Sequence, residues 1–378
     1  MVLPHDVTEI RQGEFKGRAF RKGHIIRPED IEHLKRLGKE NIYILELAAD
    51  DIHENEAAVL MATALAGSGV EVVGEPIEGK LNLVAGRDGL LRVDRQALYR
   101  FNLLGEVMCA TLHSETLVSK GQQVAATRLI PLVGRRLIVE EAVAIAGVRS
   151  STAQPAIANA MTVSSEMAAS AIAGSRITGM ASSEIAKSEV AKPGIIRVDA
   201  LRKAKSGLVI TGNEVYHGRV KDAFEPVLRQ KLAAIGSEVV RALKAPDNTE
   251  KIAAAIGDCL SAGADLIITS GGMSVDPDDV TRAGIALAGA VDLTYGTPVL
   301  PGAMFMVGYI PQDHGRDVPI LGLPACGMFH RITVFDLTLP RILAGEKIDR
   351  SSFAAMGHGG LCMNCKNCLY PVCPFGKR

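Results

Sequence analysis

Short apolar runs alternate with amphipathic segments in the second half of the chain. The runs at 207–211, 264–270 and 318–323 are rich in Val, Ile and Leu. Their length and continuous hydrophobicity predict strands that are buried on both faces of a sheet. The amphipathic segments at 222–235 and 249–261 predict helices, because each is followed within two residues by glycine, which commonly ends a helix.

Further strands are predicted at 237–244 and 304–310, and a last helix at 327–343, interrupted by Pro340. Strands that alternate with helices of this length are typical of right-handed crossover units, which build a parallel sheet with helices on both faces. We therefore predict an α/β fold for residues 195–349: a three-layer α/β/α domain with a mostly parallel sheet.

The first 149 residues are less regular. Residues 27–38 predict a short helix and residues 57–66 a second one, whereas NIYILEL at 41–47 predicts a strand. Short β-rich runs, separated by glycine-containing turns, extend from 69 to 141. We expect residues 1–149 to form a smaller α+β region.

The composition changes on both sides of the α/β domain. Residues 150–194 are rich in Ala and Ser and lack aromatic residues. This favours a linker, and a set of weak helices packed on a neighbour is the alternative. Beyond the domain, residues 350–378 form a Cys-rich tail, for which we expect metal binding.

Composition and charge exclude several classes of protein. The 378 residues include 42 Lys and Arg against 42 Asp and Glu, and 47% are hydrophobic. This excludes a disordered chain. The lack of a basic excess and an aromatic content of only 4% argue against nucleic-acid binding. With no apolar run of about 18 residues and no apolar stretch typical of a secretory signal, we expect a cytoplasmic protein without a membrane span.

Polar, glycine-containing loops follow three of the predicted strands, at 211–222, 269–279 and 322–327. Parallel α/β sheets bind ligands beyond the carboxyl ends of their strands, so these loops define the candidate site. The Gly271-Gly272 pair allows a positive φ and a close approach of the backbone to a ligand. Hydroxyls beside it can bond to a phosphate or a pterin edge, and the acids of these loops can hold Mg²⁺. Ordinary turn chemistry, with Asp279 as a helix cap, is the alternative.

The order of these motifs resembles a known family. TSGGMSVDPDDV at 269–280 resembles the molybdopterin-binding loop of molybdopterin adenylyltransferases and molybdopterin molybdotransferases. TGNEV at 211–215 resembles the strand end TG-[ND]-E of that family, and APDNTEKI at 245–252 resembles a further loop. GLPACG at 322–327 resembles the family's GLPGNP loop, with Cys326 near the ligand in place of the usual residues. Segments of the N-terminal region are similar to molybdotransferases rather than to the single-domain adenylyltransferases, so the resemblance favours the molybdotransferases.

The resemblance implies a molybdopterin-binding protein of molybdenum-cofactor biosynthesis that inserts molybdate into adenylylated molybdopterin. It implies Mg²⁺ as a cofactor and the carboxylates of Glu214, Asp222 and Asp279 as catalytic groups. The substrate-binding residues that it implies are Thr211, Gly212, Asn213, Asp247, Thr269, Ser270, Gly271, Gly272, Ser274 and Pro324. A molybdopterin adenylyltransferase and a non-catalytic carrier that docks through its tail are the alternatives. We expect a homodimer whose further partner is a molybdoenzyme client or a cofactor-pathway enzyme.

Four of the seven cysteines crowd into the last 17 residues. These are Cys362, Cys365, Cys368 and Cys373, with the spacing C-x₂-C-x₂-C-x₄-C-P. A bacterial ferredoxin run is one residue shorter. Four thiolates so close together predict one metal centre, either an iron–sulfur cluster or zinc, and unliganded thiols in a disordered tail are the alternative. The tail is basic and lacks acids, which suits an acidic partner surface.

Overall fold

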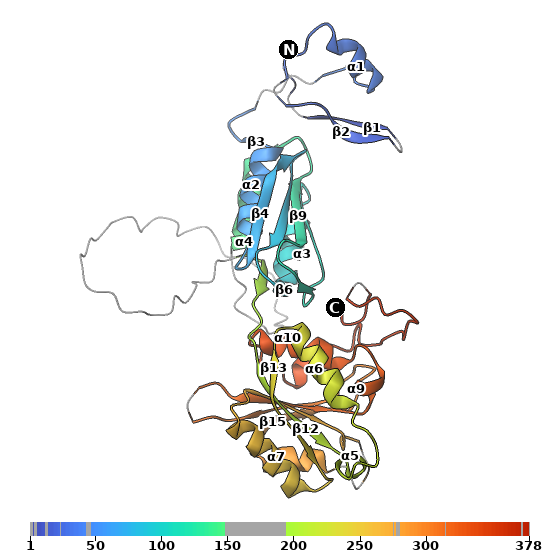
Figure 1. Cartoon of the computed structure of the whole chain (residues 1–378). Coiled ribbons are helices and arrows are strands. Elements are labelled where there is room, and N and C mark those ends of the chain that lie inside the picture. Colours follow the sequence, from blue (N-terminus) through green and yellow to red (C-terminus); the bar gives the residue numbers. More distant parts are fainter. Residues whose placement is uncertain are drawn as a thin grey trace, which may run out of the picture.

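Three units, each with its own hydrophobic core, follow one another along the chain (Figure 1). The computed structural model describes residues 3, 6–11, 14–22, 24–42, 47–147, 194–274, 276, 280–313, 315–371 and 373–377. Almost all of the expected linker, the middle of the strand expected at 41–47, and Asp279 lie outside the described residues. No helix within these described ranges has the length and apolar character needed to cross a membrane.

A six-stranded sheet in the order β13-β12-β14-β17-β16-β15 forms the centre of the C-terminal unit. Its strands are β12 (Lys205–Thr211), β13 (Glu238–Ala245), β14 (Leu266–Ser270), β15 (Val291–Tyr295), β16 (Met306–Ile310) and β17 (Val318–Leu323). β13, β12, β14 and β17 pair in parallel, whereas β16 pairs antiparallel with both β17 and β15. The predicted mostly parallel sheet is confirmed, and β15 is a strand that the sequence analysis does not predict.

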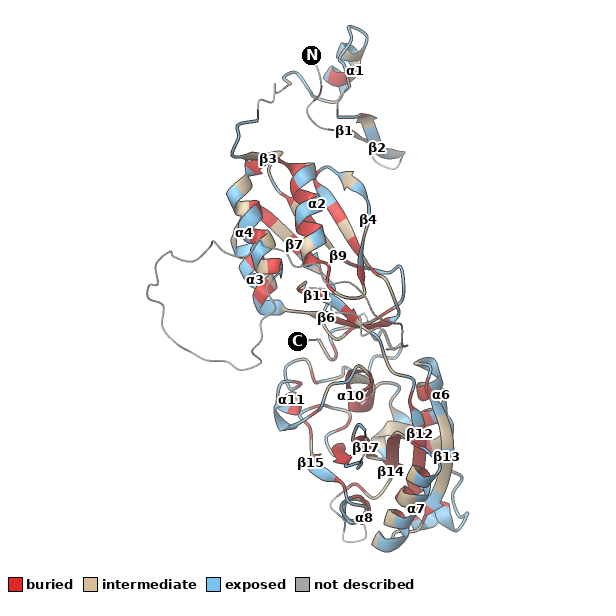
Figure 2. Ribbon diagram, turned by 90° about the vertical axis from the view of Figure 1, so that its left-hand side faces the viewer, coloured by how far each residue is buried: buried red, intermediate tan, exposed pale blue. Residues whose placement is uncertain are grey.

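Helices cover both faces of this sheet, which confirms the three-layer α/β/α arrangement. One face is covered by α6 (Phe224–Ala234) and α10 (Val334–Leu343), and the other by α7 (Thr249–Ser261) and α8 (Thr281–Leu287). Leu208 and Ile210 of β12 enter the first core and Val209 the second, because successive side chains of a strand point to opposite faces. The central strands are therefore buried along most of their length (Figure 2).

The helix predicted at 327–343 is two helices in the structure. α9 (Cys326–Phe329) ends before Thr333, and α10 begins directly after it. The Thr333 hydroxyl accepts a hydrogen bond from the Phe335 N–H, and the Asp336 carboxylate accepts one from the Thr333 N–H at 2.7 Å. This capping box starts a new helix, and Pro340 lies inside that helix rather than at its end.

The middle unit combines antiparallel sheets with helices. Its main sheet has the order β4-β5-β9-β7 and a smaller one the order β11-β6-β8. Their strands are β4 (Val70–Ile77), β5 (Lys80–Ala85), β6 (Gly89–Val93), β7 (Val107–Thr111), β8 (Leu117–Val118), β9 (Gln123–Leu129) and β11 (Ile196–Asp199). The remaining elements are β3 (Asp51–His53), β10 (Val133–Arg135), α2 (Glu54–Leu65), α3 (Arg95–Leu103) and α4 (Arg136–Gly147). The N-terminal unit consists of β1 (Val7–Arg11), β2 (Phe15–Phe20) and α1 (Asp30–Arg36).

Two of the expected domain boundaries differ in the structure. β11 pairs antiparallel with β6, so residues 196–199 belong to the middle unit and not to the α/β domain that was expected to begin at 195. The Cys-rich tail is not a separate segment either. Phe353 of α11 (Arg350–Ala354) and Phe375 are buried in the core that α6 and α10 share. Burial of these aromatic rings makes the tail part of the C-terminal unit.

A buried arginine joins the middle and C-terminal units. Arg341 of α10 is only 2% exposed, and its Nε donates to Glu346 at 3.0 Å. Glu346 also accepts a hydrogen bond of 2.6 Å from Arg92 of β6, and Glu115 lies 3.8 Å from Arg341. Burial alone would raise the pKa of Glu346. The hydrogen bond and charge of Arg341, together with the charge of Arg92, outweigh burial and lower this pKa below its ordinary value.

Glu346→Gln should destabilise the protein by about 3 kcal/mol, because it leaves buried guanidinium groups without this counter-charge. In the wild type, the pKa of Glu346 is lower in the folded state than in the unfolded state. The ionised carboxylate therefore contributes fully to stability above the ordinary pKa of 4.5, and this contribution is lost as the pH falls through the folded-state pKa. Thermal unfolding at pH 7 and at acidic pH measures both effects. A variant with the wild-type Tm at pH 7 would contradict the role of this ion pair.

Phe375→Ala should destabilise the C-terminal unit by about 3–5 kcal/mol, because it empties a ring site that is 3% exposed. Leu369→Ala is the matched control in the same tail. Leu369 is 62% exposed, so its truncation should change stability by about 0.5 kcal/mol or less. Chemical denaturation of both variants tests the assignment, and equal stability of the two would show that the tail is separate from the core.

Candidate functional site

Three neighbouring strand ends meet at one edge of the C-terminal sheet. β12, β14 and β17 are parallel, and Ile210 lies opposite Ser270, which in turn lies opposite Leu323. The chain leaves these strands into the loops that begin at Gly212, Gly271 and Pro324. The sequence analysis places the candidate site in the loops after these three strands, and the structure brings their beginnings together.

Buried hydroxyl groups form the floor under these loops. The Thr211 Oγ1 donates to the Ser270 carbonyl at 2.9 Å and lies 2.8 Å from the Thr281 Oγ1. Thr269 donates to the Leu321 carbonyl of β17 at 3.3 Å. The Ser270 Oγ is fully buried and has no hydrogen-bond partner among the described residues. These side chains connect the three strands to each other and to the start of α8.

The glycine pair fits tightly over this floor. Gly271 has φ of +91° and Gly272 φ of +54°, a conformation that residues with a Cβ rarely adopt. A Cβ on Gly271 would meet the Thr211 carbonyl oxygen at 2.5 Å, and a Cβ on Gly272 would overlap the Thr281 Oγ1. Both glycines are therefore required by the close approach of the loop to the hydroxyl groups, whether or not a ligand is bound.

A pocket of about 450 Å³ opens beside the glycine pair. Its described lining consists of Gly271, Gly272, Met273, Ser274, Leu300, Pro301, Gly302, Ala303, Met304, Pro324, Ala325 and Cys326. The Tyr295 hydroxyl donates to the Met273 carbonyl at 2.8 Å, which fixes the loop from the side of β15. The pocket thus lies between the loops that follow β14 and β17 and the segment before β16.

The described lining of this pocket is mostly apolar and carries no charged side chain. Met273, Met304 and Leu300 supply flexible apolar surface, and Cys326 adds a thiol at the first turn of α9. Burial raises the pKa of the Cys326 thiol, so it stays protonated at neutral pH and is a weak nucleophile. Such walls suit a flat, uncharged ring system better than an isolated phosphate.

Two of the acids predicted for the site, Asp222 and Asp247, have structural partners in this structure. The Asp222 carboxylate accepts hydrogen bonds from the Phe224 and Glu225 N–H groups, at 2.8 and 3.3 Å, at the start of α6. Asp247 and Asn213 bond reciprocally to each other's backbone N–H, at 2.8 and 3.2 Å. Within the described ranges, no three His, Cys, Asp or Glu side chains are placed to hold one metal ion. The described residues thus do not fit Mg²⁺ as they stand, and it remains a prediction.

The structure divides the predicted site residues into three groups. Gly271, Gly272, Ser274 and Pro324 line the pocket. Thr211, Thr269 and Ser270 lie in the floor, whereas Gly212, Asn213, Glu214, Asp222 and Asp247 belong to the neighbouring loops and are not among the described lining residues. Asp279 lies outside the described residues; α8 begins at Thr281, with Val280 as its N-cap. Sequence reasoning missed the segment 300–304, whose only signal is a Pro-Gly turn.

Comparison with known families agrees with this arrangement. Residues 207–344 match the family described as "Probable molybdopterin binding domain", and residues 1–46 match a domain of unknown function. The first match covers the strands and helices that build the sheet and the pocket, except for the first two residues of β12. Residues 207–344 are therefore similar to the molybdopterin-binding domain family, which agrees with the resemblance of the loops.

Curated relatives match over short stretches. A CinA-like protein of Mycobacterium sp. is 37% identical over 83 residues, which are 22% of this chain and 20% of the relative. A protein of Aeropyrum pernix is 36% identical over 103 residues, 27% of this chain and 37% of that protein. The chain thus spans about a fifth to just over a third of the length of these relatives.

Solved structures match over about a third of the chain. The CinA protein of Thermoplasma acidophilum is 17% identical, with 34% of this chain and 92% of that chain covered and a TM-score of 0.30. The molybdopterin biosynthesis enzyme MoaB of Thermus thermophilus is 20% identical, with 38% and 98% covered and a TM-score of 0.31.

Gly272→Ala should destabilise the protein more than Gly289→Ala does. Both glycines have positive φ, but a Cβ at Gly289 meets nothing within 4 Å, whereas one at Gly272 overlaps the Thr281 hydroxyl. The control should lose about 1–2 kcal/mol from backbone strain alone, and Gly272→Ala at least about 1 kcal/mol more. Addition of Thr281→Ala to Gly272→Ala should recover part of the difference. Equal unfolding free energies for the two glycine variants would contradict the close approach.

Proposed function

We propose that this chain binds molybdopterin in the pocket beside Gly271 and Gly272 and inserts molybdate into the adenylylated form of that molecule. The family match of residues 207–344 indicates a molybdopterin-binding domain, which is consistent with a role in molybdenum-cofactor biosynthesis. The substrate and the reaction are our proposal. The observation that carries it is the pocket at the carboxyl ends of β14 and β17.

The pocket has the size and chemistry for a pterin. Its volume of about 450 Å³ lies within the usual range for small-molecule sites, and its apolar walls can cover both faces of a ring system. Because Gly271 and Gly272 have no side chains, the ligand can approach the backbone of this turn closely. Main-chain groups can then form hydrogen bonds to the edge of the pterin. The Ser274 hydroxyl on the same wall supplies a further donor or acceptor.

The anionic end of the substrate would extend towards the acidic loop that follows Ser274. Asp276 is exposed there, and the sequence continues with Asp278 and Asp279. In our proposal, a carboxylate of this segment would hold Mg²⁺, and the ion would neutralise charge on the phosphate oxygens of the substrate. Cys326 contacts the ligand as a neutral thiol and has no nucleophilic role, because burial keeps it protonated.

A non-catalytic carrier is the second candidate function. It is favoured by the structural hydrogen bonds of Asp222 and Asp247, which occupy two of the carboxylates expected to act on the substrate. A carrier needs the pocket but not the acids. The adenylyltransferase reaction would require the same pocket together with ATP. Consumption of ATP therefore distinguishes an adenylyltransferase from the molybdotransferase and from the carrier.

The test is incubation of the full-length protein with adenylylated molybdopterin, molybdate and Mg²⁺. Release of AMP with formation of the molybdenum cofactor is expected, because molybdate insertion removes the adenylyl group in the proposed reaction. Tight binding of molybdopterin without release of AMP would favour the carrier, and consumption of ATP with unmodified molybdopterin would favour the adenylyltransferase. Absence of both binding and turnover would refute the proposal.

Asp279→Asn should lower turnover at least tenfold while the Tm barely changes. Asn caps helices about as well as Asp does, so a capping role would survive the substitution, whereas a metal-binding or charge-based role would not. Asp258→Asn, on the exposed side of α7, is the matched control and should leave turnover and Tm unchanged. Turnover of Asp279→Asn at the wild-type rate would remove this carboxylate from the reaction.

A further inference from the structure

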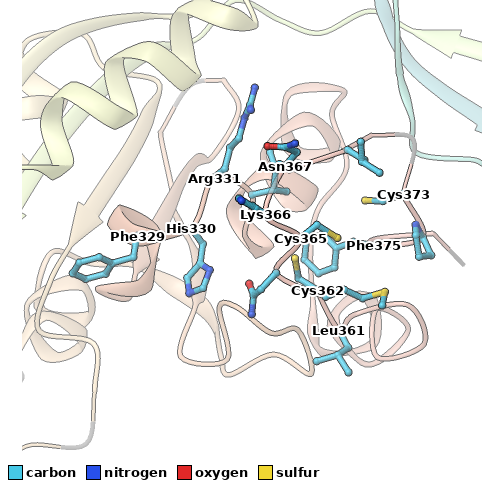
Figure 3. Close-up of a pocket in the computed structure, with 16 residues that line it drawn as sticks. Phe329, His330, Arg331, Leu361, Cys362, Cys365, Lys366, Asn367, Cys373 and Phe375 are labelled. Carbon is cyan, nitrogen blue, oxygen red and sulfur yellow. The ribbon is translucent and has the colours of Figure 1, made fainter.

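All four cysteines of the tail line one pocket. The pocket measures about 660 Å³, and Cys362, Cys365, Cys368 and Cys373 share its wall with the segment 329–332 that follows α9 (Figure 3). It is distinct from the pocket beside the glycine pair, with which it has no lining residue in common. Folding has therefore gathered four thiols around one space.

Both ends of the cysteine segment are fixed to the domain. The Cys362 N–H donates to the Leu300 carbonyl at 2.8 Å, and the Leu300 N–H donates to the Gly360 carbonyl at 2.8 Å. At the other end, Phe375 is buried in the core and the Gly376 N–H donates to the Gly359 carbonyl at 2.9 Å. The segment between Cys362 and Cys373 is thus a closed loop on a rigid base, which lowers the entropy lost when its thiols bind a common ligand.

The charges at this pocket favour an anionic centre. Arg331 and Lys366 line it together with His330, and none of its described lining residues is an acid. Four thiolates add four negative charges, which a metal centre only partly neutralises. Nearby cations stabilise the remaining negative charge.

We propose that these four cysteines bind an iron–sulfur cluster of the [4Fe–4S] type. The two C-x₂-C steps match the three cysteines of a bacterial ferredoxin run that bind one cluster, and Cys373, which lines the same pocket, supplies the fourth thiolate. A single zinc ion needs four sulfurs converging on one point at about 2.3 Å. Among the residues the structure describes, no three such ligands converge in that way. A cluster spreads its four cysteine bonds over four iron atoms, so its thiolates need not converge on a single point.

The cluster site adjoins the candidate ligand pocket through two segments. Leu300 lines the ligand pocket and carries both hydrogen bonds that hold the start of the cysteine loop. The short helix α9 begins at Cys326 in the ligand pocket and ends at Phe329 in the cysteine pocket. The proposal does not rest on the proposed function, because it concerns the tail thiols alone.

The experiment is metal and sulfide analysis of the full-length protein purified anaerobically. About four iron atoms and four inorganic sulfides per chain are expected, with a broad absorbance near 400 nm that bleaches on reduction. Stoichiometric zinc without sulfide would overturn the proposal in favour of a zinc site. Protein with neither metal would overturn it as well.

Variants locate the cluster. Cys365→Ser changes an exposed thiol of the pocket and should lose more than half of the iron and sulfide. Cys326→Ser is the matched control, since its thiol lies in the other pocket, and it should keep the full content. Far-UV circular dichroism confirms that both variants are folded. If Cys365→Ser does not fold, Cys368→Ser replaces it. Full iron content in a folded variant of these tail cysteines would overturn the assignment.

Discussion

The contact between the Thr211 and Thr281 hydroxyls is the interaction on which the candidate site depends. It connects the end of β12 to the first residue of α8, and the Thr211 hydroxyl also donates to the Ser270 carbonyl at the end of β14. Because these groups lie directly beneath Gly271 and Gly272, the loop can cross them only without side chains. The two glycines also leave the backbone of the loop without side chains where the pocket opens. The packing over the hydroxyl groups and the exposed backbone at the pocket therefore have the same cause.

The second constraint is the burial of Arg341. Its guanidinium is held by Glu346 and lies near Glu115, and Arg92 of the middle unit reaches the same Glu346 carboxylate. A charge this deeply buried must keep its counter-charges, which links the position of the middle unit to α10. The Lys377 ammonium, at the end of the tail, adds a hydrogen bond of 2.9 Å to the Thr116 hydroxyl. The tail therefore contributes to the core and also to the junction between the two units.

The periodicity of the sequence predicts most of the α/β domain, and contacts distant in sequence account for what it misses. The helix at 249–261 is confirmed with its predicted bounds because a side-chain cap and an amphipathic face act locally. The split between α9 and α10 depends on the Thr333 capping box, a local signal that the apolar pattern of 327–343 conceals. The burial of Phe375 and the pairing of β11 with β6 depend on partners far along the chain, which no local pattern reveals.

The sequence predicts only part of the candidate site, because a local pattern does not reveal contacts between residues that are distant in sequence. Strand ends and glycine pairs are visible in sequence, and four of the residues predicted there to bind substrate, Gly271, Gly272, Ser274 and Pro324, line the pocket. Hydroxyl groups and acids do not reveal their partners, and Thr211, Thr269, Asp222 and Asp247 prove to hold strands and loops together. The wall formed by 300–304 comes from a turn with no chemistry of its own.

A crystal structure of the full-length protein with bound molybdopterin would show directly whether the pocket beside Gly271 and Gly272 holds the pterin. We expect electron density for the pterin against the backbone of Gly271–Met273, between Met304 and Cys326, with its phosphate end directed to the segment after Ser274. Density in another part of the molecule, with this pocket empty at saturating ligand, would show that the pocket is not the binding site.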